Sequence, residues 1–149
     1  MRPIDHSSSD AMPEFADFAG TWHLARKIEH VREPSAVFAG KASLDPVKGG
    51  YWYREDGQLR IEGHAGFTAE RRYLWIEDGT RVKVLFEDGR PFHHIDLSQH
   101  APGDTHHCDP DIYEVHYDFA WWPRWSCVWW VRGPRKDYVM TSEYQRFLK

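Results

Sequence analysis

The sequence predicts an all-β protein, a single closed antiparallel up-and-down β-barrel of about ten strands. Three observations support this fold. Apolar and polar residues alternate along most of the chain, which is typical of half-buried strands. Turn signals separate these runs at short intervals, which leaves little room for helices or crossover connections. The 149 residues include 8 Trp, 7 Tyr and 8 Phe, large side chains that favour strands and either fill or line a small barrel.

Composition and charge argue against several classes of protein. The chain carries 19 Lys and Arg against 23 Asp and Glu, and it has no strongly basic segment that would suggest a nucleic-acid partner. No apolar stretch approaches a membrane span, and the N-terminus lacks the apolar run of a secretory signal. Two cysteines, Cys108 and Cys127, are too few for a disulfide framework. We expect a cytoplasmic protein with free thiols.

Residues 1–13 are predicted to form a flexible tail, because they are polar, contain several serines and are interrupted by prolines. A single barrel domain then spans residues 14–149. A short amphipathic turn or 3₁₀ segment over residues 12–19 is placed to plug one end of the barrel.

Turn signals divide the first half of the domain. Residues 45–50, Asp-Pro-Val-Lys-Gly-Gly, supply turn chemistry, and Asp56-Gly57 is a tight-hairpin signal. Together with the alternation they predict strands from Trp22 onward and at 37–44, 51–55 and 59–67.

Two further Asp-Gly pairs, at 78–79 and 88–89, and Gly133-Pro134 divide the second half. They predict strands at 69–76, 81–87, 92–97, 106–119, 125–132 and 135–146. The sequence does not decide which face of these strands points inward, because Val82, Val84 and Leu85 are apolar and belong to both faces of one strand. Closure into a barrel removes every strand edge, so we favour a barrel over a two-sheet sandwich.

The start of the first strand resembles a known motif. Gly20-Thr21-Trp22 is similar to the Gly-X-Trp motif of the calycin superfamily, which includes the lipocalins. In that superfamily the tryptophan closes one end of the barrel and an arginine of the last strand packs across its ring. The resemblance implies these structural roles for Gly20, Trp22 and Arg146.

Four longer blocks resemble an uncharacterised bacterial family, domain of unknown function 6314. They lie at 70–75, 86–93, 106–113 and 133–138, and the resemblance covers nearly all of residues 18–146. It implies a calycin-like barrel and carries no activity. The family's histidine positions correspond to His93 and His106.

Histidines form the first candidate site, since six of the ten lie between His93 and His116. His93 and His106 are candidate acid-base catalysts, with Asp111 or Tyr113 in support, if both imidazoles point into one pocket. His93, His106 and Cys108 are also weak candidates for a zinc site, although the spacing fits no structural zinc motif. Solvated or hydrogen-bonded loop histidines are the simpler alternative.

Inward-pointing charge forms the second candidate site. Arg26 shares the phase of Trp22, and Arg71 shares that of Tyr73, so both arginines are predicted to face the interior. A buried arginine needs a partner. Glu55 is one candidate, which gives a structural ion pair. A small anion bound by the arginines and by nearby tyrosine hydroxyls is the other. The tyrosines in question are Tyr53, Tyr73 and Tyr144.

The corner after Gly133-Pro134 is the third candidate. Arg135 and Lys136 either form a solvated corner or a basic rim at the barrel mouth. Asp111 and Tyr113 follow Pro110 and are placed to hydrogen-bond this corner, which would make both segments structural.

These observations favour a barrel that binds a small, partly apolar, anionic molecule in its interior, with no cofactor required. A small-molecule enzyme that uses His93 and His106 is the alternative. A haem-binding barrel with His116 or His64 as ligand is a weaker one. A homodimer through the aromatic segment 121–125 also stays open.

Overall fold

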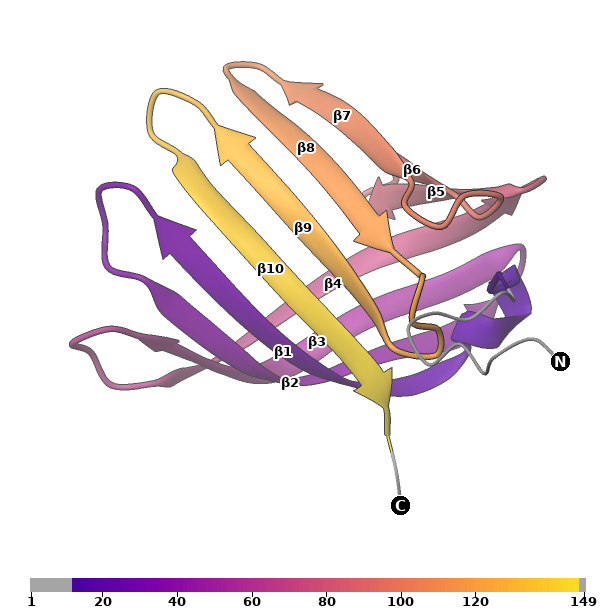
Figure 1. The fold of residues 1–149 in the computed structure, drawn as a ribbon, viewed down its shortest axis with the longest axis horizontal. Helices are drawn as coiled ribbons and strands as arrows, with labels where there is room; N and C mark the ends of the chain where they lie inside the picture. The colour runs from indigo at the N-terminus through magenta and orange to yellow at the C-terminus, as the bar shows by residue number, and fades with distance from the viewer. Residues whose placement is uncertain (1–11, 148–149) are drawn as a thin grey trace, which may run out of the picture.

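The computed structural model describes residues 12–147, and it shows a nearly closed barrel of ten antiparallel strands preceded by one 3₁₀ turn (Figure 1). This confirms the predicted fold. The elements are η1 (Phe15–Phe18), β1 (Gly20–His30), β2 (Ala36–Val47), β3 (Gly50–Ile61), β4 (Phe67–Asp78), β5 (Arg81–Phe86), β6 (Pro91–Asp96), β7 (Gly103–Cys108), β8 (Asp111–Asp118), β9 (Trp125–Arg132) and β10 (Asp137–Arg146).

Apart from β6 and β7, strands that are neighbours in sequence pair with each other, and β1 pairs with β10, so the sheet runs in the order β6-β5-β4-β3-β2-β1-β10-β9-β8-β7. Among the described residues no ladder joins β6 to β7. A side chain links the two strands instead: the backbone N–H of His94 donates to the Asp104 carboxylate at 2.7 Å. The barrel therefore closes along this seam by side chains.

The up-and-down connectivity gives the barrel two different ends. The turns β2–β3, β4–β5 and β8–β9 lie at the end that carries η1, at the right of Figure 1. The turns β1–β2, β3–β4 and β9–β10 lie at the other end. We call these the closed end and the mouth.

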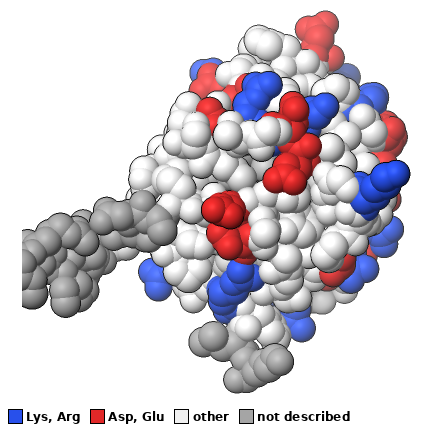
Figure 2. Space-filling model, turned by 90° about the vertical axis from the view of Figure 1, so that its right-hand side faces the viewer, with Lys and Arg blue, Asp and Glu red and all other residues white. Residues whose placement is uncertain are grey.

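Aromatic side chains fill the closed end. Phe18 of η1 is fully buried, and the Trp22 indole N–H donates to the Phe18 carbonyl at 3.0 Å. The Arg146 guanidinium lies 3.9 Å above the centre of the Trp22 ring. It also donates to the carbonyls of Ala19 and Asp17. On the outer surface of this end, acidic and basic side chains are interspersed among uncharged atoms (Figure 2).

Two predicted strand boundaries are wrong, and the errors offset each other in the number of strands. Asp56-Gly57 makes no hairpin but lies within β3, opposite Gly40 and Lys41 of β2. A Cβ atom on Gly40 would stand 2.1 Å from the Asp56 carbonyl, so glycine at this position permits the backbones of β2 and β3 to approach each other closely. The predicted strand 106–119 is in fact two strands, β7 and β8, which turn at 109–110.

The structure shows which side chains of the strands in the second half of the chain point into the barrel. Val82 and Val84 point into the core, as do Trp125, Cys127 and Trp129 of β9. The pairing of β5 with β6 shifts register between Val84 and Leu85. Two successive residues of β6, Phe92 and His93, are both buried beside this irregularity.

Of the predicted tail, residues 1–11 lie outside the described part of the chain, as do residues 148–149. Within the described part, no helix has the length and apolar character that a membrane crossing requires.

Candidate functional site at the barrel mouth

A buried ion pair crosses the middle of the barrel. Arg26 donates from Nη1 and Nη2 to the two carboxylate oxygens of Glu55, each at 2.7 Å, and from Nε to the Ser142 hydroxyl at 2.7 Å. Arg26 is 7% exposed and Glu55 is 2% exposed. The structure therefore pairs Arg26 with a residue of the chain, as one of the two alternatives predicts, and the bidentate pair neutralises its charge without a ligand.

Tyrosines extend this pair into a polar layer. The Tyr53 hydroxyl donates to Glu55 at 2.5 Å and lies 2.6 Å from the Tyr144 hydroxyl. Burial alone would raise the pKa of Glu55, but the charge and hydrogen bonds of Arg26, together with Tyr53, hold it below its usual value. Burial raises the pKa of Tyr53 and Tyr144. The layer is thus a carboxylate and a guanidinium held among neutral phenols.

The interior next to this layer is almost filled. One cavity of about 20 Å³ remains, which is room for a single water molecule. Arg26, Tyr53, Glu55, Tyr73, His93 and Tyr144 contribute to its lining, with Cys127, Trp129 and other side chains. A fatty acid or a haem does not fit a cavity of this size. The expected ligand site deep inside the barrel is therefore absent from the described interior.

His93 is one of the residues around this cavity. Its Nε2 lies 2.9 Å from the Tyr117 hydroxyl, and its Nδ1 has no hydrogen-bond partner among the described residues. Burial lowers the pKa of His93 to about 3. Its imidazole is therefore neutral over the range in which a histidine ordinarily exchanges protons.

His106 meets the Phe92 ring edge-on, with the ring centres 5.3 Å apart, and does not line that cavity. Partial burial lowers the pKa of His106. The prediction that both imidazoles share one pocket is not met. Cys108 is exposed, and residues 12–147 contain no group of three His, Cys, Asp or Glu side chains placed to hold a metal ion. The weak zinc candidate His93, His106 and Cys108 is therefore wrong.

Arg71 lies at the mouth, above the polar layer. It comes from β4 and is half-buried, and its guanidinium lies 5.4 Å from the centre of the Trp129 ring on β9. Among residues 12–147, no carboxylate lies at ion-pair distance from it. Its neighbour Arg72, which points outward, is close to both Glu70 and Glu87.

Aromatic rings surround Arg71. Tyr73 stacks on Phe92 at 5.8 Å, and Phe92 stacks on Phe86 at 4.7 Å. Phe92 also meets Trp129 edge-on at 5.2 Å. A broad groove of about 590 Å³ runs along Arg71, Tyr73 and Phe86, and its other lining residues are the charged Arg72, Glu87, Asp88 and Arg90. Arg71 is thus a cation in an aromatic setting that remains open to solvent.

The corner between β9 and β10 is held from inside the mouth. Lys136 donates to the Tyr113 hydroxyl at 2.9 Å and lies 3.2 Å from the Asp111 carboxylate. The hydrogen bond to Tyr113 and the Asp111 charge raise the pKa of Lys136. Lys136, Asp111 and Tyr113 therefore support this corner structurally, whereas Arg135 has no such partner among the described carboxylates.

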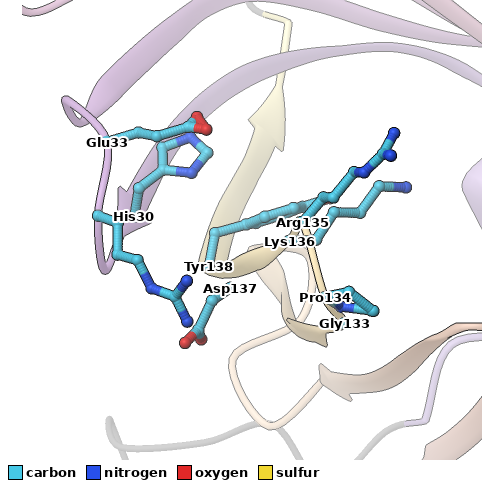
Figure 3. A pocket seen from close by; sticks show the side chains of 9 residues that line it. His30, Glu33, Gly133, Pro134, Arg135, Lys136, Asp137 and Tyr138 are labelled. Atoms are coloured by element: carbon cyan, nitrogen blue, oxygen red, sulfur yellow. The ribbon is translucent and has the colours of Figure 1, made fainter.

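A cleft of about 260 Å³ separates two hairpin turns on the rim of the mouth (Figure 3). His30, Arg32 and Glu33 line one side, and residues 133–138 line the other. We call it the rim cleft.

The remaining candidates lie away from the mouth's interior. His64 and His116 are exposed, so neither is an inward haem ligand. Of the aromatic segment 121–125, Trp125 is buried and Trp122 packs on Phe18, which leaves Trp121 as its exposed tryptophan.

Several mouth residues were not predicted: Trp129, Phe86, Tyr138, His30 and Arg32. Trp129 follows Trp125 at even spacing and so lies on the same face of β9. The sequence does not decide whether this face points inward, and for that reason it does not identify Trp129. His30 and Arg32 carry no local signal, because only the pairing of β1 with β10 brings them opposite residues 133–138.

A family model described as "Family of unknown function" (DUF6314) matches residues 18–146. No curated protein matches the chain. Among solved structures, the S-type phycobiliprotein lyase CPES from Guillardia theta is similar to it, with a TM-score of 0.61 and 10% sequence identity over 91% of each chain. At this identity the likeness shows the fold alone, and it agrees with a calycin-like barrel.

Proposed function

This chain belongs to the family of unknown function DUF6314, and we propose that it binds a small, partly apolar molecule with an acidic group at the mouth of its barrel. One observation carries the proposal: Arg71 is half-buried against Trp129 without a carboxylate partner among the described residues. A solved barrel of similar fold is a phycobiliprotein lyase, which supports the scaffold and not that activity for this chain.

The environment of Arg71 favours an acidic ligand. Partial burial removes water from a guanidinium, and that cost is recovered when a carboxylate accepts two parallel hydrogen bonds. The Glu55 charge beneath it is already held by Arg26 at 2.7 Å. A ligand carboxylate is therefore the partner that Arg71 lacks.

The surroundings of Arg71 favour a flat apolar body on this ligand. Tyr73 and Phe86 line the groove beside the guanidinium. Phe86 and His106 meet edge-on at 5.8 Å. Arg72, Glu87, Asp88 and Arg90 also line this groove, so its walls are mixed, and the aromatic rings among them bind a planar ring by stacking and by burial of apolar surface.

The test is calorimetric titration with benzoate, 2-naphthoate and anthracene-2-carboxylate, each compared with its uncharged amide. We expect at least one acid to bind about tenfold more tightly than its amide, since a charge-assisted pair contributes about 1.4 kcal/mol or more. Arg71→Gln is expected to remove this preference.

Arg54→Gln is the matched control. It removes the same charge from an exposed side chain of β3 that pairs with Asp56 at 3.0 Å and does not line the groove, and binding should be unchanged. The proposal is overturned if none of the three acids binds better than its amide, or if Arg71→Gln binds them as the unmodified chain does.

A further inference from the structure

We propose that the rim cleft is a second oxyanion subsite, so that the ligand of the mouth carries two acidic groups. This inference rests on the proposed function. It is carried by the two guanidinium groups of the cleft, which come from different hairpins, and by the residues that the cleft shares with the mouth.

The cleft contains cations that the chain does not neutralise. Arg32 and Arg135 both line it, and neither lies at ion-pair distance from a carboxylate of residues 12–147. Glu33 and Asp137 also line the cleft, yet Figure 3 shows Arg135 extending away from both. Two unpaired guanidinium groups beside a cleft of about 260 Å³ suit a carboxylate or a phosphate group.

Hydrogen-bonding side chains complete the cleft. His30 and Tyr138 line it together, with their ring centres 5.4 Å apart. An imidazole nitrogen and a phenol hydroxyl both donate to an oxyanion, and they are shorter and stiffer than the arginines. They define the floor over which the acidic group would lie.

The cleft and the mouth adjoin through two residues. Lys136 lines the cleft and hydrogen-bonds Tyr113, whose ring meets Trp129 edge-on at 6.0 Å. Tyr138 lines the cleft, and the charges of Arg71 and Lys136 are both close enough to lower its pKa against the rise caused by burial. A ligand with one acid on Arg71 can therefore pass over Tyr138 and place a second acid in the cleft.

Lys136 is not the cation that would bind the second acidic group. Asp111 lies 3.2 Å from its ammonium and Tyr113 accepts its hydrogen bond, so its charge is largely used within the chain. The subsite thus depends on Arg32 and Arg135. The class of ligand is an aromatic molecule with two acidic groups at opposite ends.

The experiment compares rigid diacids with their monoacids. 2,6-Naphthalenedicarboxylate is set against 2-naphthoate, and biphenyl-4,4′-dicarboxylate against biphenyl-4-carboxylate, by calorimetric titration. We expect one diacid at least to bind about tenfold more tightly than its monoacid, the gain of one further charge-assisted pair. The double variant Arg32→Gln/Arg135→Gln should lose that gain and keep the affinity for the monoacid.

Arg81→Gln/Arg124→Gln is the control with the same change of net charge, because both arginines are exposed and lie at the closed end, Arg81 at the start of β5 and Arg124 just before β9. It should retain the preference for the diacid. A variant of each diacid with a phosphate in place of the second carboxylate identifies which oxyanion the cleft prefers.

The outcomes separate the two proposals. If monoacids bind through Arg71 but no diacid or carboxylate-phosphate probe binds more tightly, the rim cleft is no subsite and the proposed function stands. The same conclusion follows if the closed-end control loses the preference equally, since general charge would then explain it. If no monoacid binds better than its amide, the proposed function itself fails.

Discussion

The two ends of the barrel each place an arginine on a tryptophan, and the two pairs differ in how completely the arginine is bound. At the closed end, Arg146 lies 3.9 Å above Trp22 and donates to the Ala19 and Asp17 carbonyls. At the mouth, Arg71 lies 5.4 Å from Trp129 and has no carboxylate at ion-pair distance within residues 12–147.

The difference distinguishes the structural arginine from the one that we propose binds a ligand. Both guanidinium groups rest on an indole, which contributes about 0.5–2 kcal/mol in either place. At the closed end two backbone carbonyls accept hydrogen bonds from the guanidinium, so the chain itself holds Arg146. At the mouth the aromatic contact exists, but no carboxylate of residues 12–147 pairs with Arg71. The missing carboxylate, not the presence of an arginine, is the reason to propose the mouth as the binding end.

The largest expected effect comes from removing the carboxylate partner of a buried arginine. Glu55→Gln leaves Arg26 charged and without its carboxylate at a site that is almost fully buried. We expect a loss of about 3–5 kcal/mol in the free energy of unfolding, measured by urea denaturation.

Glu114→Gln is the matched control for Glu55→Gln. It breaks the ion pair with Arg132, which is formed at 2.9 Å on the surface, and should cost less than about 1 kcal/mol. Equal losses in the two variants would show that burial does not decide the cost of an unpartnered arginine, and the comparison of the two ends would fail.

A smaller effect on stability is expected from His93, which is also buried without full hydrogen bonding, because its Nδ1 lacks a partner among the described residues. Its pKa is about 3 in the folded protein, lowered by burial, against an ordinary value of 6.5. Between these values the unfolded chain binds a proton that the folded chain excludes. Stability is therefore complete above pH 6.5 and falls as the pH falls towards 3.

The expected loss is about 2 kcal/mol between pH 6.5 and pH 5, at about 1.4 kcal/mol per pH unit. Glu55, with a pKa held below its usual value, contributes only at lower pH. His93→Gln should flatten this part of the stability profile. His106→Gln is the control, because His106 is less buried and should change the slope less. An unchanged slope in His93→Gln would show that His93 is not neutral in the folded state.

The sequence predicts the closed end and the middle layer well, the closed end through the resemblance of Gly20-Thr21-Trp22 to the Gly-X-Trp motif and the middle layer through alternation along the first strand. Once Trp22 faces inward, Arg26 must do so too, and the need for a partner points to Glu55. The error at Asp56-Gly57 shows the limit of local signals. Glycine is required there by the close passage of Gly40 from another strand, which no nearby residue reveals.

The mouth is less predictable for a similar reason. Arg71 is in phase with Tyr73 and was expected to face inward, but the tryptophan beneath it comes from β9, across the barrel. The rim cleft needs the pairing of β1 with β10 to exist at all. Contacts between elements distant in sequence define this end, and alternation within a strand carries no information about them.

The smallest expected effects test the two arginines directly. Arg146→Gln removes the contact with Trp22 and charged hydrogen bonds to two carbonyls, so we expect a loss of about 1–2 kcal/mol in unfolding free energy. Arg71→Gln removes a similar aromatic contact but also a half-buried charge without a carboxylate partner, and these terms oppose each other. Its stability should therefore change by less than about 0.5 kcal/mol. Urea denaturation of both variants gives the comparison. A loss at Arg71 as large as that at Arg146 would mean that the chain already completes the coordination of Arg71, and the mouth would then have no vacancy for an acid to fill.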